Sequence, residues 1–103
     1  MEDNKLNVII TPEAEDDIVE LCNYIAFDVM AHNTAIRYYI GIYDTIKKLS
    51  VVGAMLPVSQ QRYLRKRYGE DVRTISYKNT TIVYNIIGNV VYVRRVTASS
   101  LIR

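Results

Sequence analysis

Residues 69–96 read GEDVRTISYKNTTIVYNIIGNVVYVRRV, and this stretch decides the fold. It holds three runs rich in β-branched and aromatic residues, which are typical of β-strands: residues 72–78, 81–87 and 90–97. The pairs Asn79-Thr80 and Gly88-Asn89 separate these runs, and a Gly-first pair is a hairpin signal. The last two runs are apolar on both faces, which is typical of central strands. The stretch therefore predicts an antiparallel three-stranded meander.

Two helices are predicted upstream of the meander. Thr11 can cap the first helix and Pro12 suits its first position, and an apolar stripe follows at Ala14, Ile18, Leu21, Ile25 and Val29. Asn33 is the predicted cap of a second helix that runs to about residue 50, with a stripe at Ile36, Tyr39, Tyr43, Ile46 and Leu49. The short break between them predicts an antiparallel helical hairpin. Gly41 is interpreted as simple tolerance of glycine inside the second helix.

The remaining apolar run, residues 6–10, predicts a first strand at the edge of the sheet. Residues 51–61 contain glycine, proline and serine and are predicted to form a loop. The predicted order is β-α-α-β-β-β, in one domain spanning residues 1–103. This is an α+β fold in which the helical hairpin packs on one face of a mostly antiparallel four-stranded sheet.

Composition argues against several classes of function. The 103 residues include one cysteine, Cys22, and one histidine, His32, so neither a disulfide within the chain nor a clustered metal site is expected. No glycine-rich nucleotide motif occurs, and no cofactor is expected. No leader-like segment or run of 18 apolar residues occurs, so we expect no signal peptide, no membrane span and a cytoplasmic protein.

Charge is divided unevenly along the chain. Residues 1–50 carry four Lys/Arg and nine Asp/Glu, a net charge of −5, whereas residues 51–103 carry nine and two, a net charge of +7. Either the two halves attract each other in the fold, or the basic half faces an anionic partner. Tyrosines lie among the basic residues, and nine tyrosines against one phenylalanine favour a surface role because each hydroxyl needs a partner.

The ordered set of segments resembles the RelE/ParE superfamily of type II toxin–antitoxin toxins. ITPEAEDDIVELCNYI at residues 10–25 and AIRYYIGIYDTIKKL at residues 35–49 are similar to the two helices of that family. Residues 69–96 are similar to its sheet, with Gly69, Arg73 and Arg95 at corresponding places. The similarity covers nearly the whole chain, and the segment lengths from Gly69 to Ala98 are more typical of the ParE-like branch.

The resemblance implies one of two activities. ParE-like members act on DNA gyrase, which makes a gyrase-directed toxin of plasmid-stabilisation type the first expectation. RelE-like members are ribosome-dependent mRNA endoribonucleases, and under that alternative the catalytic candidates are Arg73, Lys78 and Arg95. For binding of a target or of nucleic acid, the candidates are Arg62, Arg65, Lys66, Arg67, Tyr68 and Tyr77. A degenerate member that only binds its antitoxin is a third alternative.

The sequence departs from the ribonuclease pattern at two positions. Thr81 stands where many of the ribonucleases carry an arginine, and Ala98 stands where many members of the family carry a histidine. No tyrosine or histidine follows Tyr92, so acid–base chemistry would fall to Tyr77, Lys78 or an arginine. An arginine is a poor base because its pKa exceeds about 12. The enzyme question is therefore left open, and binding is favoured over catalysis.

Two adjacent arginines, Arg94 and Arg95, end the last strand. Strand alternation predicts that they point to opposite faces. We expect Arg94 to pair with Asp17 or Glu20, and we expect Arg95 to face the open side with the basic residues. The resemblance also implies a partner, a cognate antitoxin with an acidic, partly disordered segment that neutralises the basic half.

Overall fold

The structure is a computed structural model that describes residues 5–101. Its elements are β1 (Asn7–Ile10), α1 (Pro12–Asn23), the π-helical turn η1 (Tyr24–Asp28), α2 (His32–Val52), α3 (Arg62–Tyr68), β2 (Arg73–Tyr77), β3 (Thr80–Ile87), β4 (Val90–Ala98) and η2 (Ser99–Leu101). The strands form one sheet in the order β1-β4-β3-β2, with β1 parallel to β4 and the other pairs antiparallel. The predicted α+β class, the β-strand order along the chain and the edge position of β1 are confirmed.

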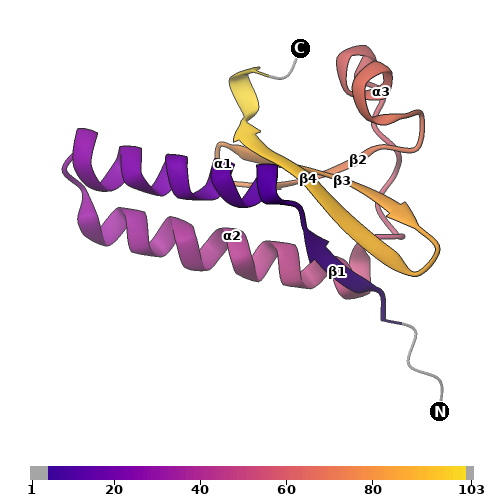
Figure 1. The fold of residues 1–103 in the computed structure, drawn as a ribbon, viewed down its shortest axis with the longest axis horizontal. Helices are drawn as coiled ribbons and strands as arrows, with labels where there is room; N and C mark the ends of the chain where they lie inside the picture. The colour runs from indigo at the N-terminus through magenta and orange to yellow at the C-terminus, as the bar shows by residue number, and fades with distance from the viewer. Residues whose placement is uncertain (1–4, 102–103) are drawn as a thin grey trace.

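The hairpin of α1 and α2 covers one face of the sheet (Figure 1). The main core lies between the helical hairpin and the sheet, and its buried residues are Ala14, Ile18, Ile42, Ile46, Leu49, Ile82, Tyr84, Val91, Val93 and Val96. Thr11 caps α1 by accepting a hydrogen bond from the Ala14 amide, and its own hydroxyl donates to the Val93 carbonyl at 2.8 Å. The start of α1 is therefore fixed to β4, and the helix then runs beside that strand.

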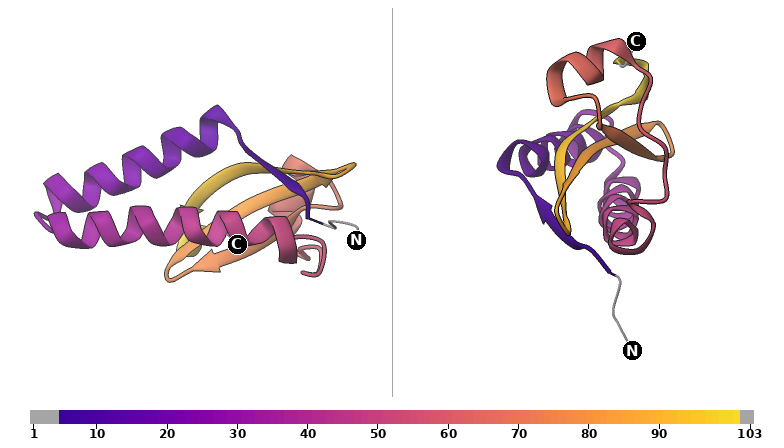
Figure 2. Two further views of the ribbon diagram at one scale, coloured as in Figure 1. Left: turned by 90° about the horizontal axis from the view of Figure 1, so that it is seen from below. Right: turned by 90° about the vertical axis from the view of Figure 1, so that its right-hand side faces the viewer.

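The far end of the hairpin extends beyond the sheet (Figures 1 and 2). Several apolar side chains there are poorly covered, since Phe27, Met30 and Ile36 are more than half exposed. The predicted apolar stripe of α2 is therefore wrong in its first half, because Ile36 and Tyr39 face outward while Ala35 and Ile42 are buried. The predicted cap is also wrong, since Ala31 is the N-cap of α2.

Gly41 has a packing role that the sequence did not indicate. A Cβ atom at this position would overlap the aromatic ring of Tyr77, which lies directly against the backbone of α2. The Tyr77 hydroxyl donates to the Arg37 carbonyl at 3.4 Å, and its ring meets Tyr38 edge-on. The interpretation of Gly41 as simple tolerance is wrong, because the absent side chain lets β2 approach α2.

The second face of the sheet carries α3, a short helix that the sequence did not predict. Seen along the long axis of the molecule, α3 and α2 lie on opposite sides of the strands (Figure 2). A small separate cluster joins α3 to the sheet through Leu64, Val72 and Val83, with Tyr68 packed against it. Buried Asn85 donates to the Tyr68 carbonyl at 3.1 Å and so holds the end of α3 on β3.

Both predicted hairpins are present. Gly88 has a φ of 63°, as a Gly-first turn requires, and this turn lies where it was predicted. The first turn is shifted by one residue, to Lys78-Asn79, and Lys78 takes a left-handed φ of 53° while Thr80 already belongs to β3. The correction removes Lys78 from strand β2 and places it at the turn.

Candidate functional site

A β-bulge in β4 sets the direction of the two adjacent arginines. Val83 of β3 is paired with Arg95, and the next residue, Tyr84, is paired with Val93, so Arg94 is left without a partner in β3. Val93 and Val96 are both buried in the main core, with two residues between them instead of one. Arg94 and Arg95 therefore both lie on the α3 face, and the prediction of opposite faces is wrong.

Arg95 is bound by a carboxylate of α1. Its Nε donates to Asp17 Oδ2 at 2.7 Å and its Nη2 donates to Oδ1 at 3.1 Å, which is a two-point contact. The same Oδ2 accepts the backbone N–H of Val96 at 2.9 Å. Asp17 thus accepts a backbone N–H of β4 beyond the point where β1 ends. The same carboxylate raises the pKa of Arg95 further above its ordinary value.

The predicted carboxylate partner is thus confirmed as Asp17, but the assignment to Arg94 is wrong. The bulge explains the exchange, because it directs Arg95 toward the margin of β4 where α1 lies. Glu20, the alternative partner, is exposed on α1. We estimate the Asp17 contacts at about 1–3 kcal/mol, since the arginine remains partly open to solvent.

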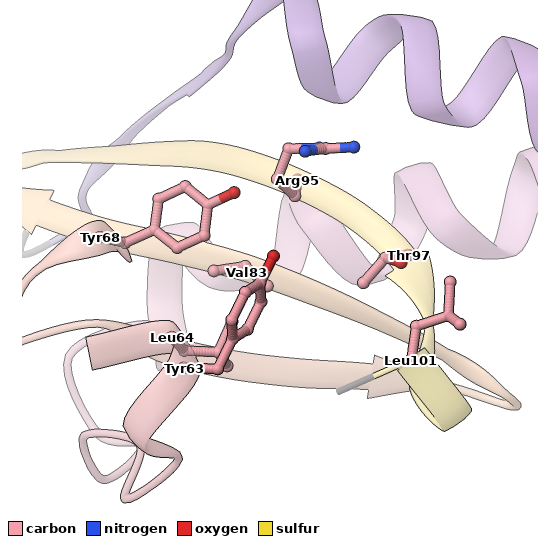
Figure 3. A pocket seen from close by; sticks show the side chains of 7 residues that line it. All are labelled: Tyr63, Leu64, Tyr68, Val83, Arg95, Thr97 and Leu101. Carbon is pink, nitrogen blue, oxygen red and sulfur yellow. The ribbon is translucent and has the colours of Figure 1, made fainter. Parts of the chain in front are cut away.

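Three guanidinium groups surround Tyr68. The Arg67 Nε donates to the Tyr68 hydroxyl at 3.1 Å, and this bond raises the pKa of Arg67. The guanidinium carbons of Arg67 and Arg94 lie 5.6 Å and 5.8 Å from the centre of the Tyr68 ring, within the range of cation–π attraction. Figure 3 shows the Tyr68 hydroxyl directed toward Arg95. We call Arg67, Tyr68, Arg94 and Arg95 the arginine cluster.

Two recesses meet at the arginine cluster. One, of about 290 Å³, is lined by the whole cluster and by Glu13 of α1. The other, of about 220 Å³, lies between α3, the sheet and η2, and its lining is Tyr63, Leu64, Tyr68, Val83, Arg95, Thr97 and Leu101 (Figure 3). Because Tyr68 and Arg95 line both, a charged recess lies beside a cavity whose walls carry both apolar and polar side chains.

The three residues considered for ribonuclease chemistry lie in different environments. Arg73 donates through Nη1 to the carbonyls of Ala54 and Leu56, at 3.0 and 2.5 Å, and so holds the loop after α2. Lys78 stands at the β2–β3 turn beside the rings of Tyr38 and Tyr77. Arg95 binds Asp17. Through Val83 of β3, Arg95 is in register with Thr74 of β2, so Arg73, the residue before Thr74, projects from the other face of the sheet. The three side chains form no common cluster.

The residues considered for binding divide into three groups. Arg67 and Tyr68 belong to the arginine cluster. Another recess on α3 is lined by Arg62, Arg65 and Lys66 together with Glu70, which pairs with Arg65 at 3.6 Å. Tyr77 lies apart, between β2 and α2. The arginine cluster therefore contains two of the six predicted binding residues and is completed by Arg94 and Arg95 from β4.

Sequence reasoning missed the parts of this site that depend on α3 and on the bulge. Tyr63 and Asn85 are not among the residues that the sequence predicted for binding. One signal for the bulge was present, since the apolar residues Val91, Val93 and Val96 break the regular spacing of two. No such signal marks Asn85, whose role depends on where α3 ends.

Other kinds of site find little support. Within residues 5–101, no group of three histidine, cysteine or acidic side chains could hold a metal ion. None of the helices described for this chain is long and apolar enough to cross a membrane. A surface of guanidinium and tyrosine side chains is suited to binding an anionic partner.

The architecture defines an α+β protein in which a helical hairpin covers one face of a four-stranded sheet and a basic site occupies the other. No protein-family model and no curated protein matches the sequence. Solved structures do share the fold. A chain of the chromosomal ParDE toxin–antitoxin system from P. aeruginosa aligns with a TM-score of 0.72 and 15% identity, over 93% of this chain and 98% of that one.

A chain of the toxin–antitoxin complex RelBE2 from Mycobacterium tuberculosis aligns with a TM-score of 0.53 and 15% identity, over 91% of this chain and 98% of that one. Both similarities extend over nearly the full length of the two chains compared. The comparisons thus confirm the resemblance to RelE/ParE toxins at the level of the fold. The ParDE chain has the higher of the two TM-scores.

Proposed function

We propose that this protein is the toxin of a type II toxin–antitoxin system, that it acts by binding DNA gyrase, and that a cognate antitoxin neutralises it. The observation that carries the proposal is the full-length match of the fold to chains of the ParDE and RelBE2 systems. The basic half of the chain, with its net charge of +7, suits an antitoxin with an acidic segment.

The surroundings of the arginines favour binding over RNA cleavage. Arg73 is engaged with two backbone carbonyls and Arg95 with a carboxylate, so neither is free to surround a scissile phosphate. Position 98, where many family members carry histidine, is Ala98 at the end of β4. A gyrase-directed toxin needs a contact surface and no tuned acid or base, and the arginine cluster supplies such a surface.

The test begins with inducible expression in a bacterial host, where the proposal expects growth arrest. Purified protein is then added to DNA gyrase in a supercoiling assay and to translating ribosomes with a labelled mRNA. We expect loss of supercoiling and intact mRNA. A double variant, Arg67→Ala with Arg94→Ala, should restore supercoiling, whereas the matched variant Arg62→Ala, on the same helix but outside the arginine cluster, should inhibit like the parent protein.

Two results would overturn the proposal. Ribosome-dependent mRNA cleavage without an effect on gyrase would establish the ribonuclease alternative. Normal growth and no effect in either assay, from protein that is folded by circular dichroism, would leave only antitoxin binding.

A further inference from the structure

The two recesses at the arginine cluster differ in chemistry but share a wall. Tyr68 and Arg95 line both, so a ligand that fills one recess contacts the border of the other. On one side lie the guanidiniums of Arg67 and Arg94, and on the other lie aliphatic carbons of Leu64, Val83 and Leu101. A ligand that carries an anion next to an apolar group would match both recesses.

Two of the three guanidiniums have charge available for a ligand. Asp17 occupies Arg95 with a two-point contact. Within residues 5–101, no ion pair joins Arg67 or Arg94 to a carboxylate, and both instead lie over the Tyr68 ring. Both arginines line the charged recess, so a carboxylate that enters it meets planar donors of the kind that bind carboxylates well.

The acidic start of α1 limits the extent of this positive surface. Glu13 lines the charged recess, and Glu15 and Asp16 are exposed on the same helix. An extended phosphate backbone that crossed Arg94 toward α1 would approach these carboxylates and be repelled. A single carboxylate brings one negative charge near Glu13, whereas an extended strand brings several, so the charges favour a peptide over a nucleic-acid strand.

The second recess supplies the apolar part of the site. Leu64 and Val83 form a buried floor, while Leu101 of η2 stands at the edge with 68% of its surface exposed. Figure 3 shows Leu101 and Thr97 across the cavity from Tyr63 and Tyr68. An aliphatic side chain placed there would cover Leu101 and remove apolar surface from water.

We propose that these two recesses form one docking site for a peptide segment in which an aspartate or glutamate follows a leucine-like residue. The carboxylate binds Arg67 and Arg94, and the aliphatic side chain enters the cavity between Tyr63 and Leu101. The inference deepens the proposed function and rests on it in one respect, since an antitoxin is the partner that would supply such a segment.

The experiment uses the full chain labelled with ¹⁵N and the peptide acetyl-Gly-Leu-Asp-Gly-amide at low ionic strength. Titration should shift the amide signals of Tyr63, Tyr68, Thr97 and Leu101 in the NMR spectrum. Arg94→Ala should weaken binding about tenfold, because a charge-assisted contact is lost. Leu101→Ser should weaken it about threefold through the lost apolar contact.

Matched controls separate the two recesses. Peptides with asparagine in place of aspartate, or serine in place of leucine, should each bind more weakly than the parent peptide. Arg62→Ala and Arg67→Ala both remove an exposed arginine of α3, and only the second should reduce affinity. Circular dichroism of each variant shows whether the fold is kept.

Three outcomes would overturn the inference: no shifts with the Leu-Asp peptide, equal binding of the asparagine or serine peptide, or tighter binding of the ribodinucleotide UpU at the same residues. None of them bears on growth arrest or gyrase inhibition. A protein that is toxic but does not bind the peptide would contradict only the docking site, and a non-toxic protein that binds it would contradict only the toxin assignment.

Discussion

The two faces of the sheet are built differently. The hairpin face buries ten residues in a continuous cluster that includes Ile18, Ile82 and Tyr84, with no ionisable carboxylate or guanidinium among its members. The α3 face has only Leu64, Val72 and Val83 in its buried cluster, and around it lie arginines, tyrosines and two recesses. Stability is thus concentrated on one face, and the groups available to a partner are concentrated on the other.

The difference explains why one short bulge matters. On the hairpin face, Val93 and Val96 keep their places in the core although the strand gains a residue between them. That extra residue is Arg94, which has no partner in β3 and lies on the α3 face beside Arg95. The bulge therefore serves the binding face without disturbing the stabilising one.

The largest expected effect comes from a cavity in the hairpin face. Ile82→Ala removes three side-chain carbons from a fully buried position and should lower the free energy of unfolding by about 3–4 kcal/mol. Urea denaturation followed by circular dichroism measures the change. The exposed residue Val19 is the matched control, and Val19→Ala should cost less than about 0.5 kcal/mol. Equal losses at both positions would contradict the division between the faces.

The next effect concerns the contact between α2 and β2. Gly41→Ala gains about 1 kcal/mol of helix propensity, but the new methyl group overlaps the Tyr77 ring. We expect a net loss of about 2 kcal/mol in thermal or urea unfolding, since the ring and β2 must shift. In the Tyr77→Ala background the same substitution should become neutral or stabilising. A stabilising Gly41→Ala in the parent protein would show that the contact is easily relieved.

Much of the hairpin face could be predicted from the sequence because its signals are local. The capping Thr11, the Gly88 turn and the apolar strand runs each act over a few residues. The first half of the α2 stripe could not be predicted, because tertiary contacts such as that of Tyr38 with Tyr77 decide which side of α2 faces the sheet. Gly41 likewise depends on a tyrosine 36 positions further along the chain.

The α3 face was less accessible to sequence reasoning. Its helix has seven residues and a single buried one, Leu64, so it shows no apolar periodicity. The helix is held by the sheet, through Asn85, and this contact follows from tertiary structure alone. The basic residues were recognised by their charge, but which arginine meets Asp17 was decided by the bulge.

The third prediction uses the link between α1 and the arginine cluster. Asp17→Asn keeps the shape of the side chain but removes the charge that binds Arg95, and should lower stability by about 1–2 kcal/mol. Asp16→Asn, at the neighbouring exposed position, should cost less than about 0.5 kcal/mol. Chemical denaturation at neutral pH compares the two. An equal, small loss in both variants would mean that the Asp17–Arg95 contact adds little to the fold.

The smallest effect appears at high pH and belongs to the hairpin face. The Tyr84 hydroxyl donates to the Gly53 carbonyl at 2.8 Å, and burial raises the pKa of Tyr84 to about 12. Because the folded-state pKa lies above the ordinary value of about 10, the folded protein holds this proton longer than the unfolded chain does. The contribution is fully present below about pH 10 and declines as the pH rises toward 12, by about 1.4 kcal/mol at pH 11.

Tyr84→Phe isolates this contribution from other tyrosines, such as Tyr43, whose pKa burial also raises. At pH 7 the variant should be about 1 kcal/mol less stable than the parent, because the bond to Gly53 is lost. By pH 11 the parent has lost this advantage, and the free energies of unfolding of the two proteins, plotted against pH, should meet or cross. If the difference between them stays constant from pH 7 to pH 11, Tyr84 does not titrate with folding and the burial of its hydroxyl is incomplete.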